Sequence, residues 1–132
     1  MHPTSPIVLE LGAADLADLP DRSDPADPAS PLDPAAFATD IIARCLEAGA
    51  DAVLFLPGAL PPAFFDLRTR LAGELLQKLA NYRLRMAAVV PDLAEATARS
   101  DSFRDFVREA NAGRLCRLTA DRNEALAWIE GA

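Results

Sequence analysis

Apolar and polar residues alternate along this chain with two periods, one typical of strands and one typical of helices. Short apolar runs bounded by turn residues predict strands. Longer segments, in which apolar residues recur every three or four positions, predict helices with one buried face. The predicted strands cover residues 7–11, 51–57, 83–91 and 114–119, and the predicted helices cover residues 34–48, 66–83, 102–112 and 121–129.

Strand and helix therefore alternate four times, with short connections everywhere except after the first strand. Because right-handed crossovers join parallel strands, this order predicts an α/β fold with a four-stranded, mainly parallel sheet and helices on both faces. We expect a flavodoxin-like strand order of 2-1-3-4 and a single domain over residues 1–132.

Residues at the predicted helix ends support these boundaries. Asp33 is suited to cap the first helix, with Pro34 at its first position, and Gly49 is suited to end it. The apolar stripe of this helix comprises Ala38, Ile41, Ile42, Cys45 and Leu46. Later helices begin at two sequences that resemble capping boxes, Ser102 with Asp105 and Asp121 with Glu124.

The connection after the first strand, residues 12–34, differs in composition from the rest of the chain. It carries six Asp, one Arg and five Pro, and so supplies −5 of the net charge of −7. Such a segment cannot bury enough apolar surface to fold alone, which predicts a solvated loop. Asp recurs at every third residue from Asp15 to Asp27, but the ligand spacing of a calcium loop is absent.

The composition and charge of the chain argue against some classes of binding partner. Hydrophobic residues make up 51% of the 132 residues, which is typical of a globular protein. A net charge of −7 argues against nucleic acid and against an anionic membrane surface. The sequence shows no secretory signal, and Cys45 and Cys116 both fall on apolar faces, so we expect reduced core thiols and a cytoplasmic location.

Several kinds of chemistry lack their residues in this sequence. The only histidine is His2, close to the terminus, and there is no C-x-x-C motif. Neither a G-x-G-x-x-G nor a G-x-x-x-x-G-K-[ST] motif follows any predicted strand. We therefore assign no catalytic residue, no metal ligand and no cofactor.

The densest group of polar side chains lies in the predicted helix over residues 66–83. Its leucines form one face, and most of its polar residues fall opposite, as on a solvated helix. Arg68 instead projects from the apolar face, where an unpaired guanidinium is costly. We predict either a structural ion pair, with Asp66 or a carboxylate beyond the third strand, or a ligand contact at the carboxyl edge of the sheet. The candidate ligand- or partner-binding residues are Asp66, Arg68, Thr69, Glu74, Gln77, Lys78 and Asn81.

The sequence from Asp51 to Ile129 resembles an uncharacterised bacterial family of domains of unknown function. The resemblance is carried by the pattern F-F-D-L-[RK]-T…L-A-G-E-[IL]-L-Q-K…N-Y-R, which this chain follows from Phe64 to Arg83. The chain departs from the pattern at Arg70, where the family usually has glycine. Family members also tend to carry a hairpin before the first helix, of which only residues 7–11 are clear here. The resemblance implies a fold and no activity.

The order of elements is also similar, more distantly, to the STAS domain of anti-sigma-factor antagonists. In those proteins a Ser or Thr at the start of the helix after the central strand is a phosphorylation switch, and Thr69 occupies a comparable place. The D-S-S-G motif that surrounds that residue is absent.

Two functions of different classes fit these observations. The first is a non-enzymatic cytoplasmic regulatory or binding module, which acts through a protein partner or a small polar ligand. The alternative is a small enzyme that uses carboxylate and Arg residues at the carboxyl edge of the sheet on a polar metabolite. A homodimer formed through the polar helix face is a third arrangement that the sequence permits.

Overall fold

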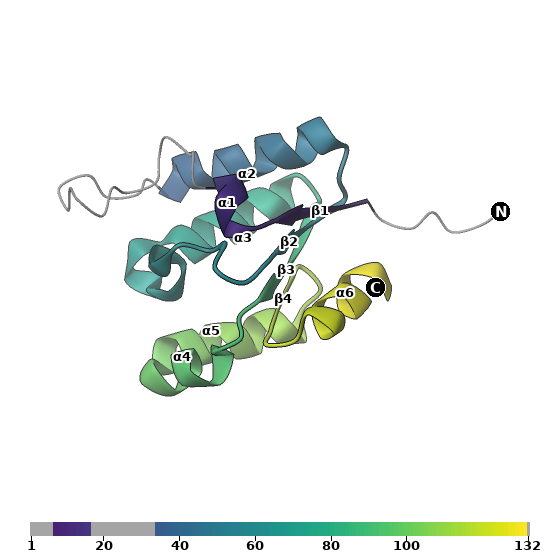
Figure 1. Ribbon diagram of the computed structural model, residues 1–132. Coiled ribbons are helices and arrows are strands. Elements are labelled where there is room, and N and C mark those ends of the chain that lie inside the picture. The colour runs from purple at the N-terminus through teal and green to yellow at the C-terminus, as the bar shows by residue number, and fades with distance from the viewer. Residues whose placement is uncertain (1–6, 17–33, 132) are drawn as a thin grey trace.

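The computed structural model describes residues 7–16 and 34–131, and Figure 1 shows the arrangement of their helices and strands. Asp33 and most of the Asp- and Pro-rich connection lie outside the described residues. The elements are β1 (Val8–Leu11), α1 (Ala13–Leu16), α2 (Pro34–Ala48), β2 (Ala52–Phe55), the 3₁₀ helices η1 (Pro62–Phe65) and η2 (Leu67–Thr69), α3 (Leu71–Asn81), β3 (Arg85–Val89), α4 (Leu93–Arg99), α5 (Asp101–Ala112), β4 (Cys116–Thr119) and α6 (Arg122–Gly131).

The strands of the described residues form a four-stranded parallel sheet in the order β1-β2-β3-β4. The α/β class and the parallel sheet are confirmed, but the predicted order 2-1-3-4 is wrong. Consecutive strands lie next to each other throughout, which is the commoner arrangement for sequential strands. The sheet therefore has no point at which the strand order reverses.

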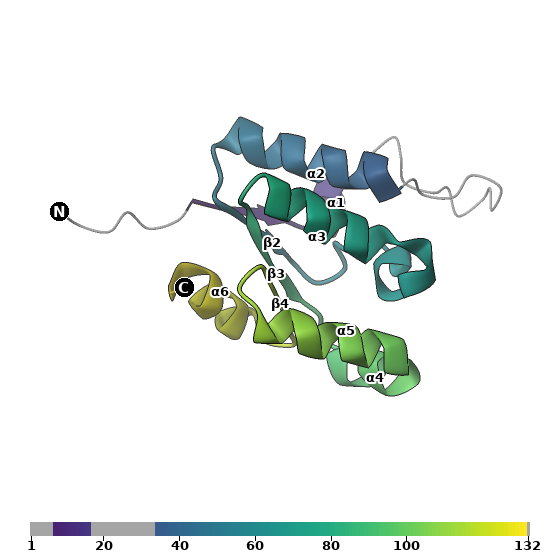
Figure 2. The same cartoon turned by 180° about the vertical axis from the view of Figure 1, so that it is seen from behind.

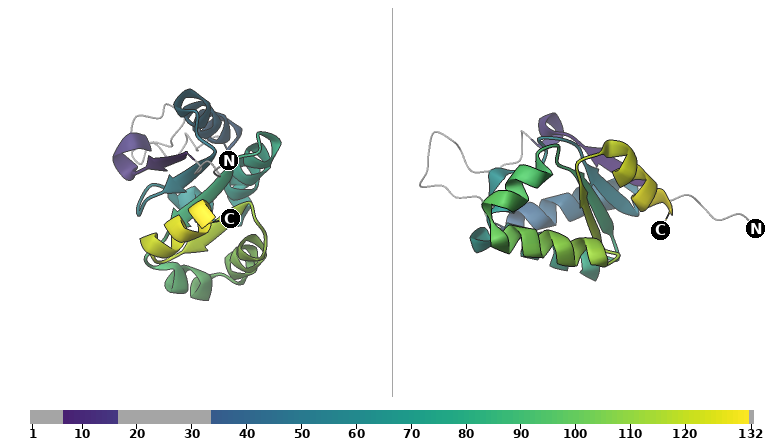
Figure 3. Two further views of the ribbon diagram at one scale, coloured as in Figure 1. Left: turned by 90° about the vertical axis from the view of Figure 1, so that its right-hand side faces the viewer. Right: turned by 90° about the horizontal axis from the view of Figure 1, so that it is seen from below.

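This order decides how the helices cover the sheet. Every crossover advances in the same direction, so right-handed connections place α2, α3 and α5 on one face. The last helix, α6, packs on the opposite face through Ala125 and Ile129. Figure 3 (left) shows α2, α3 and α5 on one side of the strands and α6 on the other. Helices do cover both faces, as predicted, but most of them cover one.

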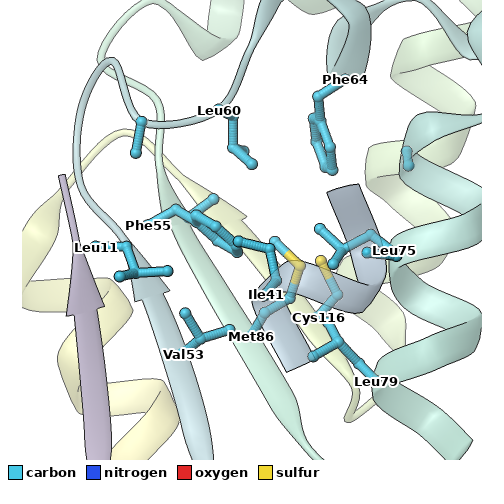
Figure 4. Packing of buried hydrophobic residues seen from close by; sticks show 14 of the residues in the cluster. Leu11, Ile41, Val53, Phe55, Leu60, Phe64, Leu75, Leu79, Met86 and Cys116 are labelled. Carbon is cyan, nitrogen blue, oxygen red and sulfur yellow. The ribbon is translucent and has the colours of Figure 1, made fainter. Parts of the chain in front are cut away.

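The larger core lies between the sheet and the α2–α3–α5 layer. Alternate strand residues point into it, and the register aligns Val53 with Met86 and Met86 with Cys116. Figure 4 shows these side chains packed against Ile41 of α2 and Leu75 of α3. On β1, Leu9 and Leu11 face this core while Val8 faces the α6 side, as the alternation predicts.

Helix α2 confirms its predicted start at Pro34 and its end before Gly49. Gly49 has a φ of 64°, and the amides of Gly49 and Ala50 donate to the carbonyls of Leu46 and Cys45. These bonds form a Schellman motif, which satisfies the last carbonyls of the helix. The prediction for Leu46 is wrong, because its side chain is 57% exposed at the end of the helix.

Two features near α5 also differ from the sequence predictions. The amide of Phe103 donates to the hydroxyl of Ser100, so Ser100 rather than Ser102 caps α5. Before it, α4 forms a helix that no apolar stripe predicts, and none of its described residues is buried. At α6 the capping prediction holds for Asp121, whose carboxylate accepts from the amide of Asn123.

Candidate functional site

The segment over residues 66–83, predicted as one helix, is divided in the structure. A 3₁₀ turn, η2, precedes α3, and Arg70 between them has a φ of 68°. This left-handed conformation interrupts the helical hydrogen bonding, so α3 begins at Leu71. The Thr69 hydroxyl donates to the carbonyl of Asp66 and accepts from the amide of Leu71, so it holds the junction together.

The division of this segment changes the position of Arg68. Its side chain is 90% exposed, so the prediction that it lies on the buried face is wrong. The predicted pairing with Asp66 is present, at 3.0 Å between the Arg68 Nη2 and the Asp66 Oδ2. Hydrogen bonds from the Arg68 side chain, and then from its amide, lower the pKa of Asp66. Asp66 is therefore a charged carboxylate at neutral pH and a poor general acid.

A groove runs between η2 and α3 on one side and α5 on the other, on the helix layer that faces the viewer in Figure 2. We call it the α3–α5 groove. It consists of three adjoining hollows lined by described residues, with volumes of about 310, 410 and 270 Å³. Leu67 lines the first two hollows and Phe106 the last two, so each hollow adjoins the next.

The apolar part of the groove is formed by half-buried side chains. Leu67, Leu76, Phe106, Ala110 and Leu115 line it and pack against the main core beneath. At the end nearest η1, aromatic rings hold α5 in place, with Phe64 and Phe106 centroids 6.1 Å apart and Phe65 and Phe103 centroids 5.4 Å apart. The groove therefore has a firm apolar floor.

The groove brings together four of the predicted site residues. Asp66 and Arg68 line the first hollow with Ser100 and Ser102. Glu74 and Gln77 line the middle hollow with Arg70 and Gly73. The residues that line these hollows do not include Thr69, Lys78 or Asn81.

The contribution of α5 was missed by sequence reasoning. Ser102, Phe106, Glu109 and Ala110 line the groove from that helix. The available signal was the position of Phe106 and Ala110 in the apolar stripe of α5, since stripe residues can be only half-buried where two helices diverge.

Gly73 lies on the α3 wall of this groove and is the third residue of the helix. A Cβ built on Gly73 meets nothing within 4 Å, so the structure has room for a larger residue. Glycine in the middle of a helix costs about 0.5–1 kcal/mol relative to alanine, and the cost in this first turn is at most about that. Packing within the described residues does not explain this glycine. A molecule bound in the groove would explain it, because that molecule would need the space that a side chain at position 73 fills.

The carboxyl edge of the sheet has a smaller hollow than those of the groove. A hollow of about 130 Å³ lies there, lined mainly by apolar residues such as Leu56, Leu60 and Val90, with Asp92 at its rim. Open α/β sheets bind ligands where the strand order reverses, and the described strands contain no such reversal. The described strands therefore lack the switch-point crevice of a doubly wound sheet.

Comparison with known proteins gives one family. A model described as "Domain of unknown function (DUF4180)" matches residues 27–129, which is more than half of the chain. No curated protein and no solved structure matches the chain. Among the helices of the described residues, none has both the length and the apolar character needed to cross a membrane.

Proposed function

The chain belongs to the DUF4180 family of domains of unknown function, and we propose that it is a non-enzymatic binding module that acts through a protein partner. We propose that the partner lies in the α3–α5 groove. A regulatory role in the cytoplasm fits this proposal, since the buried thiols Cys45 and Cys116 are free, as in a reducing compartment.

The observation that carries the proposal is the form of the groove. Its adjoining hollows of about 310, 410 and 270 Å³ extend along two helices, whereas a small-molecule site is usually a single enclosed cleft. An apolar floor with polar residues on both walls is the pattern of grooves that take an amphipathic helix. Gly73 supports the same proposal, because it keeps one wall low at a cost in helix stability.

The proposal is tested by photo-crosslinking in cells that produce the full chain. Benzoylphenylalanine replaces Gln77, an exposed residue on the α3 wall of the groove, in one variant and Ala43 in the other. Ala43 is an exposed residue of α2, which does not line the groove. We expect a discrete protein adduct from position 77 and none from position 43. No protein adduct from position 77, or the same adducts from both positions, would contradict the proposal.

A further inference from the structure

Arginines gather at the amino edge of the sheet, where β3 and β4 begin. At the carboxyl edge, the residues after the strands include Asp15, Asp92 and Asp121. At the amino edge, residues 82–86 and 113–117 contain four arginines, Arg83, Arg85, Arg114 and Arg117. Asp51, which precedes β2 at this edge, accepts from the amide of Ile7 through its carboxylate. A chain with a net charge of −7 therefore presents a cluster of cations where β3 and β4 begin.

Two of these arginines are used by the fold. Arg85 and Arg117 lie against the ring of Trp128 on the α6 side, with guanidinium carbons 5.1 and 5.7 Å from its centroid. Arg85 also donates to the carbonyl of Ile129 at 2.6 Å. These cation–π contacts attach α6 to the sheet.

The other two arginines, Arg83 and Arg114, are exposed, and within the described parts of the chain neither side chain has a hydrogen-bond or ion-pair partner. They precede neighbouring strands, since Met86 of β3 is paired with Cys116 of β4 and the amide of Met86 donates to the carbonyl of Leu115.

Arg114 also lines the last hollow of the groove, about 270 Å³ in volume, together with Leu76, Phe106, Ala110 and Leu115. Glu109 is the acidic residue on the same hollow. Tyr82, which precedes Arg83, is 52% exposed. Tyrosine and arginine are among the residue types that dominate binding energy at protein interfaces, and here Arg114 lines the hollow while Tyr82 is exposed at the end of α3.

From this charge complementarity we infer that the amino-edge end of the α3–α5 groove binds an acidic segment of the partner protein. A large apolar side chain of that segment enters the last hollow, and carboxylates three or four residues away pair with Arg83 and Arg114. This inference rests on the proposed function and specifies the chemistry of the partner.

The test begins with random 12-residue peptides displayed on phage and selected against the full chain. We expect the selected peptides to carry Asp or Glu near a Leu, Phe or Trp. Their dissociation constants are then measured by fluorescence anisotropy. Arg83→Glu and Arg114→Glu are each expected to weaken binding at least tenfold, and Glu109→Gln to tighten it. Arg99→Glu, which changes an exposed arginine of α4 far from this end of the groove, is the matched control and should leave binding unchanged.

A second pair of variants separates the inference from the proposed function. Gly113 lines the last hollow, and a Cβ there meets its nearest neighbour at 3.7 Å, so Gly113→Trp can fill the hollow and Gly113→Ala is its control. One outcome would overturn the inference and leave the proposed function standing. In that outcome the selected peptides lack Asp and Glu, bind equally well to both arginine variants, and lose binding to Gly113→Trp. No enrichment, or binding unaffected by Gly113→Trp and by Gly73→Trp, would overturn both. Tighter binding of a 12-nucleotide single-stranded DNA than of any peptide would overturn the acidic-peptide assignment.

Discussion

Two arginines of this chain have the left-handed backbone that glycine adopts most easily, Arg70 with a φ of 68° and Arg83 with a φ of 57°. Arg83 follows α3 in a Schellman motif, since the amides of Arg83 and Leu84 donate to the carbonyls of Ala80 and Leu79. Gly49 occupies the same position after α2. Among the described residues, the same kind of helix end is thus formed with glycine after α2 and with arginine after α3.

We predict that Arg83→Gly raises the free energy of unfolding by about 1 kcal/mol. The left-handed conformation costs an L-residue about 1–2 kcal/mol, and glycine avoids this cost. Part of the gain is offset because glycine loses more backbone entropy on folding than arginine does. The measurement is urea denaturation followed by circular dichroism. Arg83→Ala is the control, because alanine keeps the Cβ and should bring no such gain.

The opposite change applies to the other helix end. Gly49→Ala should lower the free energy of unfolding by about 1 kcal/mol, because alanine is strained in the left-handed conformation that Gly49 adopts. Stabilities that do not move in opposite directions for Arg83→Gly and Gly49→Ala would contradict the motif assigned to both ends.

These residues also mark a limit of sequence reasoning. Gly49 predicted the end of α2 because glycine is a direct signal of a left-handed residue. Arg70 carries no such signal, so the break before α3 was missed, and with it the exposure of Arg68. The family resemblance held the missing information, since the glycine usual at position 70 fits the observed φ of 68°.

At the scale of the element, Asn111 of α5 protects the outer edge of β4. Its amide nitrogen donates to the carbonyl of Leu118 at 3.0 Å, and its amide oxygen accepts from the Leu118 amide at 2.8 Å. The side chain thus takes the place of a neighbouring strand at an edge that would otherwise be open to pairing.

We predict that Asn111→Ala lowers the free energy of unfolding by about 1–3 kcal/mol, because it leaves the buried amide of Leu118 without its partner. Asn111→Asp keeps an acceptor for that amide but loses the donor, so its loss should be smaller. Thermal denaturation of the three proteins gives the comparison. Equal stability of Asn111→Ala and the parent would show that the edge needs no protection.

Gly73 gives a prediction that separates stability from binding. Gly73→Ala should raise the free energy of unfolding by up to about 1 kcal/mol through helix propensity, without changing the affinity for a groove-binding peptide. Gly73→Trp should remain folded, because nothing lies within 4 Å of the added Cβ, but should lose that affinity. A destabilised Gly73→Ala, measured by urea denaturation, would mean that the glycine serves the fold itself.

Periodicity predicted which segments are helical better than it predicted where a helical segment is interrupted. The spacing of Leu67, Leu71, Leu75 and Leu79 continues across the break at Arg70, so the pattern suggested one helix where the structure has η2 and α3. Leu67 remains half-buried on the groove and still fits an apolar stripe. The helix α4 was missed for the complementary reason, because it buries none of its described residues and so leaves no stripe.

At the scale of the whole molecule, local pattern determined the class of fold but left the strand order open. Parallel strands with right-handed crossovers follow from the alternation of elements. Whether β1 lies at the edge or inside the sheet depends on pairings between distant residues, which periodicity does not encode. The observed order places α2 on the same face as α3 and α5, whereas the order 2-1-3-4 would place α2 on the opposite face.

The thiols of Cys45 and Cys116 are buried in the core, so their reactivity tests how well the core is packed. Burial raises the pKa of Cys45 to about 11 and that of Cys116 to about 12, from an ordinary value of 9.0. We predict that neither reacts with 5,5′-dithiobis(2-nitrobenzoic acid) in the native protein at pH 8, and that both react after denaturation. Rapid reaction of either thiol in the native state would contradict its burial.

The same shifts fix the direction of a pH effect. Because the pKa values are raised in the folded state, the stability linked to these thiols is fully present below about pH 9. It is lost as the pH rises from 9 toward 11 and 12. Urea denaturation at pH 8 and pH 10.5 should therefore show a lower free energy of unfolding at the higher pH, and an increase would contradict the prediction.

The most direct test of the α3–α5 groove as a partner-binding surface is a map of amide chemical-shift changes. A selected peptide is titrated into the ¹⁵N-labelled full chain, and each backbone amide is followed. We expect changes concentrated at Leu67, Gly73, Leu76, Phe106, Ala110 and Leu115, which line the groove. Changes concentrated on the exposed face of α2, on α6 or at the carboxyl edge of the sheet would contradict it.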